Sequence, residues 1–171
     1  VKELEQTKTA MLNVLEDLDQ EKKQAEKLSK DLLKFQRAVE NANDQIVITD
    51  SEGIIIYANP ALEKMTGFEP NSVIGKKAGV KELWGGLENK SFYKDLWKTI
   101  KEKKQTVTGK IKNKRKDNVQ YDAQVSISPV FNNNEEVEFF VAIERDITKE
   151  QEVDRAKTEF VSLASHQLKT P

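Results

Sequence analysis

The chain has 171 residues, and its 28 basic side chains nearly balance its 29 acidic ones, for a net charge of −1. It has no cysteine and one histidine, which excludes disulfides, zinc-thiolate sites, iron–sulfur clusters, a cysteinyl flavin adduct and any site built from two imidazoles. Because charges of both signs are interspersed, without a basic surplus, we expect no nucleic-acid partner.

The sequence shows no targeting or membrane-spanning segment. No apolar run approaches the roughly 20 residues that span a bilayer, and the start, "VKELEQTKTA", lacks the features of a signal peptide. We therefore expect a cytoplasmic location, with membrane attachment through an upstream segment left open. The missing initiator Met suggests a piece of a longer protein, although an engineered or processed start would look the same.

Residues 1–42 contain no Gly or Pro and are rich in Glu, Lys, Gln, Leu and Ala. Counting in sevens gives two sets of positions, and ten of the twelve are apolar: Leu4, Met11, Leu18, Ala25, Leu32, Val39 and Thr7, Val14, Glu21, Leu28, Phe35, Ala42. This heptad seam predicts a coiled-coil signalling helix that pairs with a second copy of the chain. A single solvated charged helix is the alternative.

The periodicity changes after about residue 44. Two β-branched runs, 46–49 and 54–58, predict strands joined by the turn "DSEG". Asn59 suits a helix N-cap and Gly67 the left-handed residue after a helix. Apolar residues at helical spacing in "SFYKDLWKTIKEKK" predict a helix over 91–104.

Three further strands are predicted, over 106–114, "VQYDAQVSISPV" and "EVEFFVAIERDI", with turns at "KDN" and "NNN". The first of the two quoted runs places Val119, Tyr121, Ala123, Val125 and Ile127 on one face. The second places Val137, Phe139, Val141 and Ile143 on one face. Two strands, short helices and three strands predict an α+β fold with a five-stranded antiparallel sheet and helices on one side.

Residues 148–170 are again charged and helical. Their apolar stripe consists of Val153, Ala156, Phe160, Leu163, Ala164 and Leu168. His166 lies well off this stripe, and Thr170 follows it four residues later. We therefore expect an exposed imidazole on the rim of a pair of helices.

The middle of the chain resembles a PAS domain. The residues that carry this resemblance are "QIVITDSEGIIIYANPALEKMTGFEPNSVIGK" and the ending "ERDIT". The resemblance implies a PAS domain over 43–148, with Asn118 in place of a usual turn glycine. It also implies that Arg145, Asp146, Ile147 and Thr148 form a signal-relay hinge. The alternative for Arg145 and Asp146 is two solvated charges at a strand end.

The ending, "FVSLASHQLKTP", resembles the H-box of a sensor histidine kinase. The matching residues are Phe160, Ser165, His166, Leu168, Thr170 and Pro171. The resemblance implies that 149–171 are a linker helix and the first part of the dimerisation and phosphotransfer helix, and that His166 accepts phosphate. Gln167 stands where an acid is usual, Thr170 would position water for dephosphorylation, and Pro171 would kink the helix.

As a kinase, the parent protein would form a parallel homodimer and bind ATP and Mg²⁺ in a catalytic domain of the same chain. It would pass phosphate to an aspartate of a response regulator. No Gly-rich phosphate loop or Mg²⁺-binding acid cluster is visible here, so we expect these residues alone to be inactive. The alternative is a PAS-containing dimerisation or sensor module of a regulator that is not a kinase.

The ligand of the PAS domain stays undetermined at this stage. Without Cys, a light-oxygen-voltage photoreceptor is excluded, and without His in 36–148 we expect no imidazole-held haem. We expect no metal site. A non-covalent flavin near Trp84, Trp97 or Tyr57, a small apolar or acidic ligand, and an empty domain that relays upstream motion all remain open.

Overall fold

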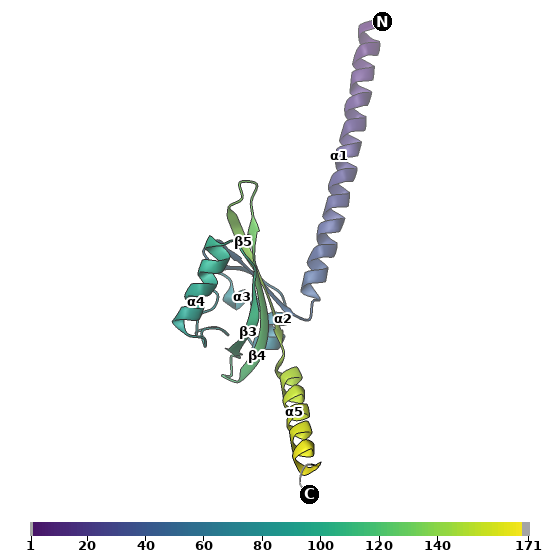
Figure 1. The fold of residues 1–171 in the computed structure, drawn as a ribbon. Helices are drawn as coiled ribbons and strands as arrows, with labels where there is room; N and C mark the ends of the chain where they lie inside the picture. The colour runs from purple at the N-terminus through teal and green to yellow at the C-terminus, as the bar shows by residue number, and fades with distance from the viewer. Residues whose placement is uncertain (1, 169–171) are drawn as a thin grey trace. The chain divides into compact units, whose positions relative to one another are not determined.

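A computed structural model describes residues 2–168, except for the side chains of residues 3, 9, 10 and 166–168 (Figure 1). The chain divides after Glu40 into two compact units. The first is helix α1, Lys2–Glu40, and the second extends from Asn41 through the last helix, α5, Thr148–Leu168. Within the described residues, none of the helices has the length and apolar character needed to cross a membrane.

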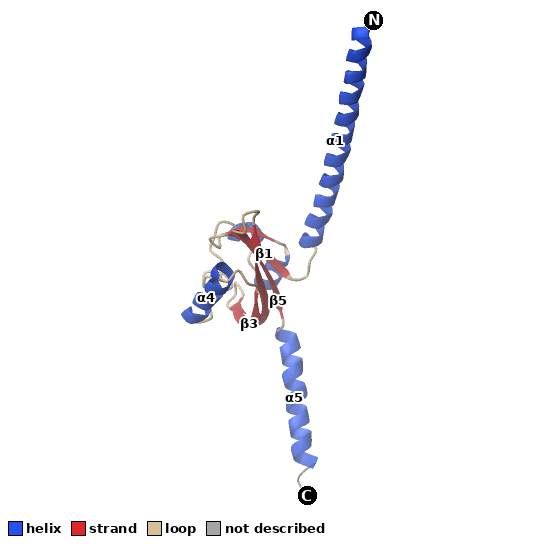
Figure 2. Cartoon of the chain, turned by 45° about the horizontal axis from the view of Figure 1, so that its top comes forward, coloured by secondary structure: helices blue, strands red, loops and turns tan. Residues whose placement is uncertain are grey.

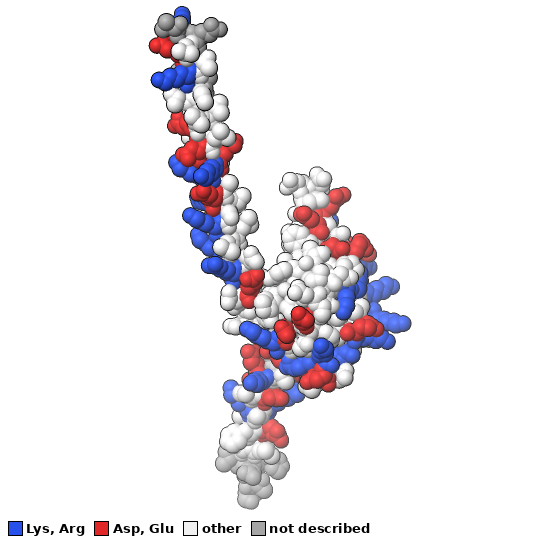
Figure 3. Space-filling view, turned by 180° about the vertical axis from the view of Figure 1, so that it is seen from behind, with Lys and Arg blue, Asp and Glu red and all other residues white. Residues whose placement is uncertain are grey.

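Helix α1 is continuous, as the lack of Gly and Pro predicts. Figure 3 shows charged side chains along one side of it and uncharged ones along the other. Seam residues such as Leu18, Leu28 and Leu32 are more than half exposed in the single chain. The helix ends before the last predicted seam residue, Ala42.

The second unit is built on an antiparallel sheet whose strand order is β2-β1-β5-β4-β3. Its strands are β1 Gln45–Asp50, β2 Ile55–Ala58, β3 Val107–Lys114, β4 Gln120–Phe131 and β5 Val137–Asp146. The predicted fold class and all five predicted strands are confirmed. The first and last strands of the domain, β1 and β5, are neighbours, so both ends of the domain meet in the middle of the sheet.

Short helices connect β2 to β3 and cover the sheet, with α4 along one face in Figures 1 and 2. They are α2 Ala61–Thr66, α3 Pro70–Val73, α4 Lys90–Trp97 and the π-helical turn η1 Lys98–Glu102. The helix predicted over 91–104 is thus present as α4 and η1. Gly67 ends α2 with a φ of 77°, which confirms its predicted left-handed position.

Asn59 has a different place from the predicted N-cap. Helix α2 is capped at Pro60, and the buried Asn59 amide bonds across to the start of β1. Its Oδ1 accepts from the Ile46 N–H at 2.9 Å, and its Nδ2 donates to the Asp44 carbonyl at 3.0 Å. Hydrogen bonds from this amide to two buried backbone groups stabilise the fold more than a cap at an exposed helix end would.

The main core cluster lies between the sheet and the short helices, and Val47, Ile55, Leu62, Val73 and Leu83 are its most buried members. In β5 the face that carries more apolar residues points away from the core. Phe140 and Glu144 are buried, whereas Ile143 is 43% exposed on the outer face. The predicted set of Val137, Phe139, Val141 and Ile143 does share one face, but it is the outer one.

Candidate signal-relay site

Two hydrogen bonds with the backbone of Asp122 in β4 hold the join between the sheet and α5. The Ile147 N–H donates to the Asp122 carbonyl at 2.9 Å, and the Asp122 N–H donates to the Thr148 hydroxyl at 3.0 Å. Ile147 itself is buried, at 5% exposure. The first turn of α5 is therefore attached directly to the start of β4.

Asp146 links the same turn to Arg115, which directly follows β3. Its Oδ1 accepts from the Thr148 N–H at 2.9 Å, and its Oδ2 accepts from the guanidinium of Arg115. Burial raises the pKa of this carboxyl, but the bonds from Thr148 and Arg115 outweigh it, so the pKa lies below its usual range. An ionised carboxylate thus sits at the N-terminus of α5, where the helix dipole favours it.

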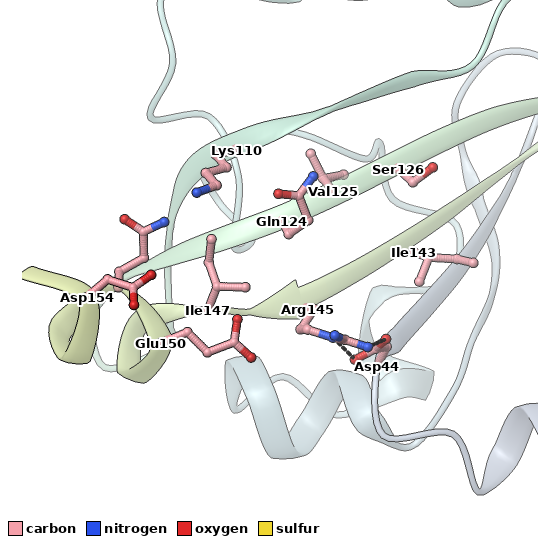
Figure 4. Close-up of a pocket in the computed structure, with 11 residues that line it drawn as sticks. Asp44, Lys110, Gln124, Val125, Ser126, Ile143, Arg145, Ile147, Glu150 and Asp154 are labelled. Atoms are coloured by element: carbon pink, nitrogen blue, oxygen red, sulfur yellow. Dashed lines mark hydrogen bonds and ion pairs between the residues drawn. The ribbon is translucent and has the colours of Figure 1, made fainter.

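Arg145 makes a bidentate ion pair with Asp44, with both nitrogen–oxygen distances 3.0 Å (Figure 4). The pair joins the end of β5 to the segment that leads into β1. Because the Arg145 side chain is 60% exposed, the pair adds little stability. Its fork geometry instead fixes where the incoming and outgoing segments lie relative to each other.

A third ion-paired group links α5 to the outer face of the sheet. Asp122 on β4 pairs with Lys112 at 2.7 Å and with Arg155 of α5 at 3.4 Å. The hydrogen bond from Lys112 is the main cause of the lowered pKa of Asp122. Around this join, an open groove of about 360 Å³ includes Lys110, Gln124 and Glu150 (Figure 4).

The structure thus gives contacts to the four predicted hinge residues, Arg145, Asp146, Ile147 and Thr148. Neither Arg145 nor Asp146 is a lone solvated charge, because each makes an ion pair. Their role in relaying a signal stays a prediction.

Of the predicted catalytic residues, His166 and Gln167 lie within the backbone of α5, which continues to Leu168. Their side chains, and the whole of Thr170 and Pro171, fall outside the described residues. The exposed imidazole, the phosphatase role of Thr170 and the kink at Pro171 therefore remain predictions.

The sequence-based analysis missed a buried acid, Glu144. It is 5% exposed, and its Oε1 accepts hydrogen bonds from the Tyr121 hydroxyl and from Asn113 Nδ2, both at 2.7 Å. Burial raises the pKa of Glu144, and the hydrogen bonds from Tyr121, Asn113 and Trp84 offset this only in part. The residue lines a partly open cavity of about 170 Å³ between the sheet and α4.

A chain of side-chain contacts connects this cavity to the first turn of α5. Glu144 bonds to the hydroxyl of Tyr121, whose pKa is raised by burial and by the neighbouring carboxyl. The guanidinium of Arg115 lies over the Tyr121 ring at 4.7 Å and also pairs with Asp146. Asp146 in turn accepts from the N–H of Thr148.

The raised pKa of Glu144 leads to a prediction about stability. Between about pH 4.3, the usual pKa of Glu, and its higher folded value, the folded chain holds a proton that the unfolded chain has lost. The free energy of unfolding should therefore fall as the pH rises through that window, by about 1.4 kcal/mol for each unit of the pKa difference. Urea unfolding of the wild-type chain and of Glu144→Gln between pH 5 and 8 measures this effect.

The Glu144→Gln variant should lose this fall, because a neutral amide has no proton to release. Glu138→Gln, on the same strand but exposed, serves as the matched control and should keep it. Parallel pH profiles for the wild-type chain and Glu144→Gln would contradict the prediction. Asp146, with its lowered pKa, acts in the opposite sense and contributes stability that is lost only below about pH 4.

The profile of the PAS domain family matches residues 43–149. The chain therefore belongs to the PAS domain family. Two solved structures share the fold. An RNA-binding light-oxygen-voltage receptor aligns with 79% of this chain and 38% of its own, at a TM-score of 0.64 and 25% identity. A PAS domain from Colwellia psychrerythraea aligns with 69% of this chain and 98% of its own, at a TM-score of 0.61 and 25% identity.

Curated relatives include kinases and at least one regulator of another kind. The chain is 29% identical to the hybrid signal transduction histidine kinase L of Dictyostelium discoideum, over 87% of this chain and 9% of the relative. It is 30% identical to the sensor protein kinase WalK of Staphylococcus epidermidis, over 78% and 20%. It is 32% identical to a nitrogen fixation regulatory protein of Klebsiella oxytoca, over 67% and 22%. The chain thus spans less than a quarter of each of these relatives.

Proposed function

We propose that this chain is the sensing and relay portion of a sensor histidine kinase. In this proposal residues 1–42 are a signalling helix, 43–148 the PAS domain, and 149–171 the linker and the start of the phosphotransfer helix. The observation that carries the proposal is the continuity of α5. It begins at the fastened join with the sheet and runs without interruption through His166.

The extent of the alignments favours a kinase over another class of regulator. An alignment over 87% or 78% of the chain must extend beyond residues 43–149, which make up less than two thirds of it. Both of these relatives are named as kinases. The nitrogen fixation regulatory protein aligns over 67% of the chain, little more than the PAS domain itself.

The helices at both ends support pairing with a second copy. On α1 the seam residues are exposed, and on α5 Val153, Phe160 and Leu163 are each more than half exposed. Long polar helices are marginal in water unless such stripes are covered. A parallel dimer with twofold symmetry would cover both stripes with one partner.

The proposed chemistry is phosphoryl transfer to an imidazole. A ring nitrogen of His166 would attack the γ-phosphorus of ATP, and the bond between that phosphorus and the β–γ bridging oxygen would break. ADP would leave with Mg²⁺, and the proton of the other ring nitrogen would pass to water. The catalytic domain of the parent chain would bind ATP and Mg²⁺, and a response-regulator aspartate would then take the phosphate. Gln167 is neutral and cannot take the imidazole proton as an acid at that position would, so positioning carries more of the catalysis.

The contacts at the join determine how a signal would travel. The hydrogen bonds of Asp122 and Asp146 hold the first turn of α5 rigidly against the sheet. A shift of β4 or β5 would therefore tilt or rotate α5. The contact chain from Glu144 through Tyr121 and Arg115 offers a route by which the cavity could bias that movement.

Incubating the full-length parent protein with labelled ATP tests the proposal. We expect one phosphate per chain that is labile in acid and stable in base, the signature of phosphohistidine, and we expect it to disappear in His166→Gln. Ser162→Ala, one turn earlier on an exposed position of α5, is the control and should retain the label. Absence of label from a folded wild-type protein, or label that persists in His166→Gln, would favour the regulator that is not a kinase.

A further inference from the structure

The partly open cavity between the sheet and α4 has one polar end and an otherwise mainly apolar lining. Trp84, Phe92, Leu96, Val125 and Ile127 are among the apolar residues that surround it. Its volume of about 170 Å³ is comparable to the roughly 150 Å³ that holds a single aromatic ring in an engineered protein cavity. Gln45, Asn113 and Glu144 form the polar end, and all three are buried.

Two acceptor atoms at the polar end have no partner. They are Oδ1 of Asn113, which is 1% exposed, and Oε1 of Gln45, which is 2% exposed. The orientation of the Asn113 amide follows from its other bond, because its Nδ2 donates to Glu144 Oε1. A buried acceptor without a partner is destabilising, so these two atoms indicate that a donor binds beside them.

The charges around the cavity limit which ligands it can bind. Among the described residues that line it, none is Lys, Arg or His, and the one ionisable acid is Glu144. An anion would therefore meet a carboxyl group and unpaired carbonyl oxygens without any positive charge. The cavity does not suit a phosphorylated flavin or an organic acid, and the acidic ligand left open by the sequence is disfavoured.

We propose that the cavity binds a small, mainly apolar, uncharged molecule that presents N–H or O–H donors to Asn113 Oδ1 and Gln45 Oε1. This inference rests on the proposed sensing role of the domain. A ligand bound there would lie beside Glu144. Its binding would change the contacts that lead from Glu144 through Tyr121 and Arg115 to Asp146 at the start of α5.

Benzyl alcohol, toluene and benzoate are suitable probes, since they share a ring and differ in donor and charge. Titration calorimetry and tryptophan fluorescence would follow their binding to the full chain, in a Trp97→Phe background where Trp84, which lines the cavity, is the one tryptophan left. We expect saturable binding of benzyl alcohol and none of benzoate. In Gln45→Met, benzyl alcohol should bind about five- to tenfold more weakly, as the loss of one hydrogen bond implies, whereas toluene should bind no more weakly.

Gln124→Met, on the outer face of β4, is the matched control and should leave both affinities unchanged. If Gln45→Met fails to fold, a crystal structure of the wild-type chain with benzyl alcohol still decides, because the hydroxyl, a single donor, should lie within hydrogen-bond distance of Gln45 Oε1. Equal binding of benzoate would overturn the proposal, as would a cavity that holds only ordered water and takes no probe. These measurements do not involve phosphorylation, so their failure leaves the result for His166 untouched.

Discussion

Replacing Asp146 by alanine should lower the free energy of unfolding by about 2–3 kcal/mol and loosen the first turn of α5. The change removes the acceptor for the Thr148 N–H and the partner of Arg115, which is only 28% exposed. Urea unfolding measures the first effect. Hydrogen exchange of the first-turn amides of α5 measures the second, and we expect it to accelerate at least about tenfold, corresponding to roughly 1.4 kcal/mol of local stability.

The control for this prediction is Asp117→Ala. Asp117 also accepts a hydrogen bond from the N–H two residues later, that of Val119 at 3.0 Å, but in an exposed turn without an ion pair. Its loss should cost about 0.5–1 kcal/mol and leave α5 unaffected. If the parent is the proposed kinase, Asp146→Ala should also shift phosphorylation of His166 from the wild-type level. Wild-type exchange and wild-type phosphorylation in a folded Asp146→Ala protein would remove Asp146 from the relay.

Asp146→Asn separates the two functions of the carboxylate. The amide oxygen can still accept from Thr148, but the charge that pairs with Arg115 is gone. We expect exchange in the first turn of α5 close to that of the wild type, together with a smaller loss of global stability than in Asp146→Ala.

Replacing Leu32 by aspartate should break the proposed dimer. Leu32 is a seam residue, and each dimer would bury two copies of it. Losing about 1.5–3 kcal/mol of apolar burial per copy should weaken association by a factor on the order of 10² to 10⁴. Analytical ultracentrifugation over a range of concentrations would report the change in the dissociation constant.

The neighbouring residue provides a matched control. Leu33 is also a leucine on α1 and also exposed in the single chain, at 45% against 60% for Leu32, but it lies outside the seam. Leu33→Asp should therefore leave the dimer intact. Equal effects of the two substitutions, or a wild-type chain that stays monomeric at high concentration, would mean that α1 does not pair along the predicted heptads.

Much of the fold could be predicted because its signals are local. Each signal depends on residues that are close in sequence. Examples are the heptads of α1, the β-branched runs of β1 and β2, and Gly67 at the end of α2. Asn118 likewise has the positive φ, 67°, that its place in the turn requires. Such preferences are set by neighbouring residues, so they can be recognised without knowing what the segment packs against.

The least predictable features depended on which face of a strand turns inward. In β5 the apolar residues Val137 to Ile143 suggest one face, yet the sheet buries the other, with Phe140 and Glu144. The helix over the sheet made the choice, because α4 covers the face that carries Phe140, whose ring lies 5.8 Å from that of Trp97, and Glu144 lines the pocket on the same side. Likewise the amide of Asn59, expected at a helix end, was taken by the backbone of a strand 13 residues away.

The sequence alone determined that one chain combines a heptad-patterned helix, an α+β domain and a second charged helix with a single histidine near its end. Periodicity and motif spacing carry that information along the chain. Only the tertiary structure decided that Glu144 is buried beside unpaired acceptors of Gln45 and Asn113, and that Tyr121 and Arg115 connect it to α5. These residues are far apart in sequence, and their chemistry arises from burial and contact, which the register of the sheet imposes.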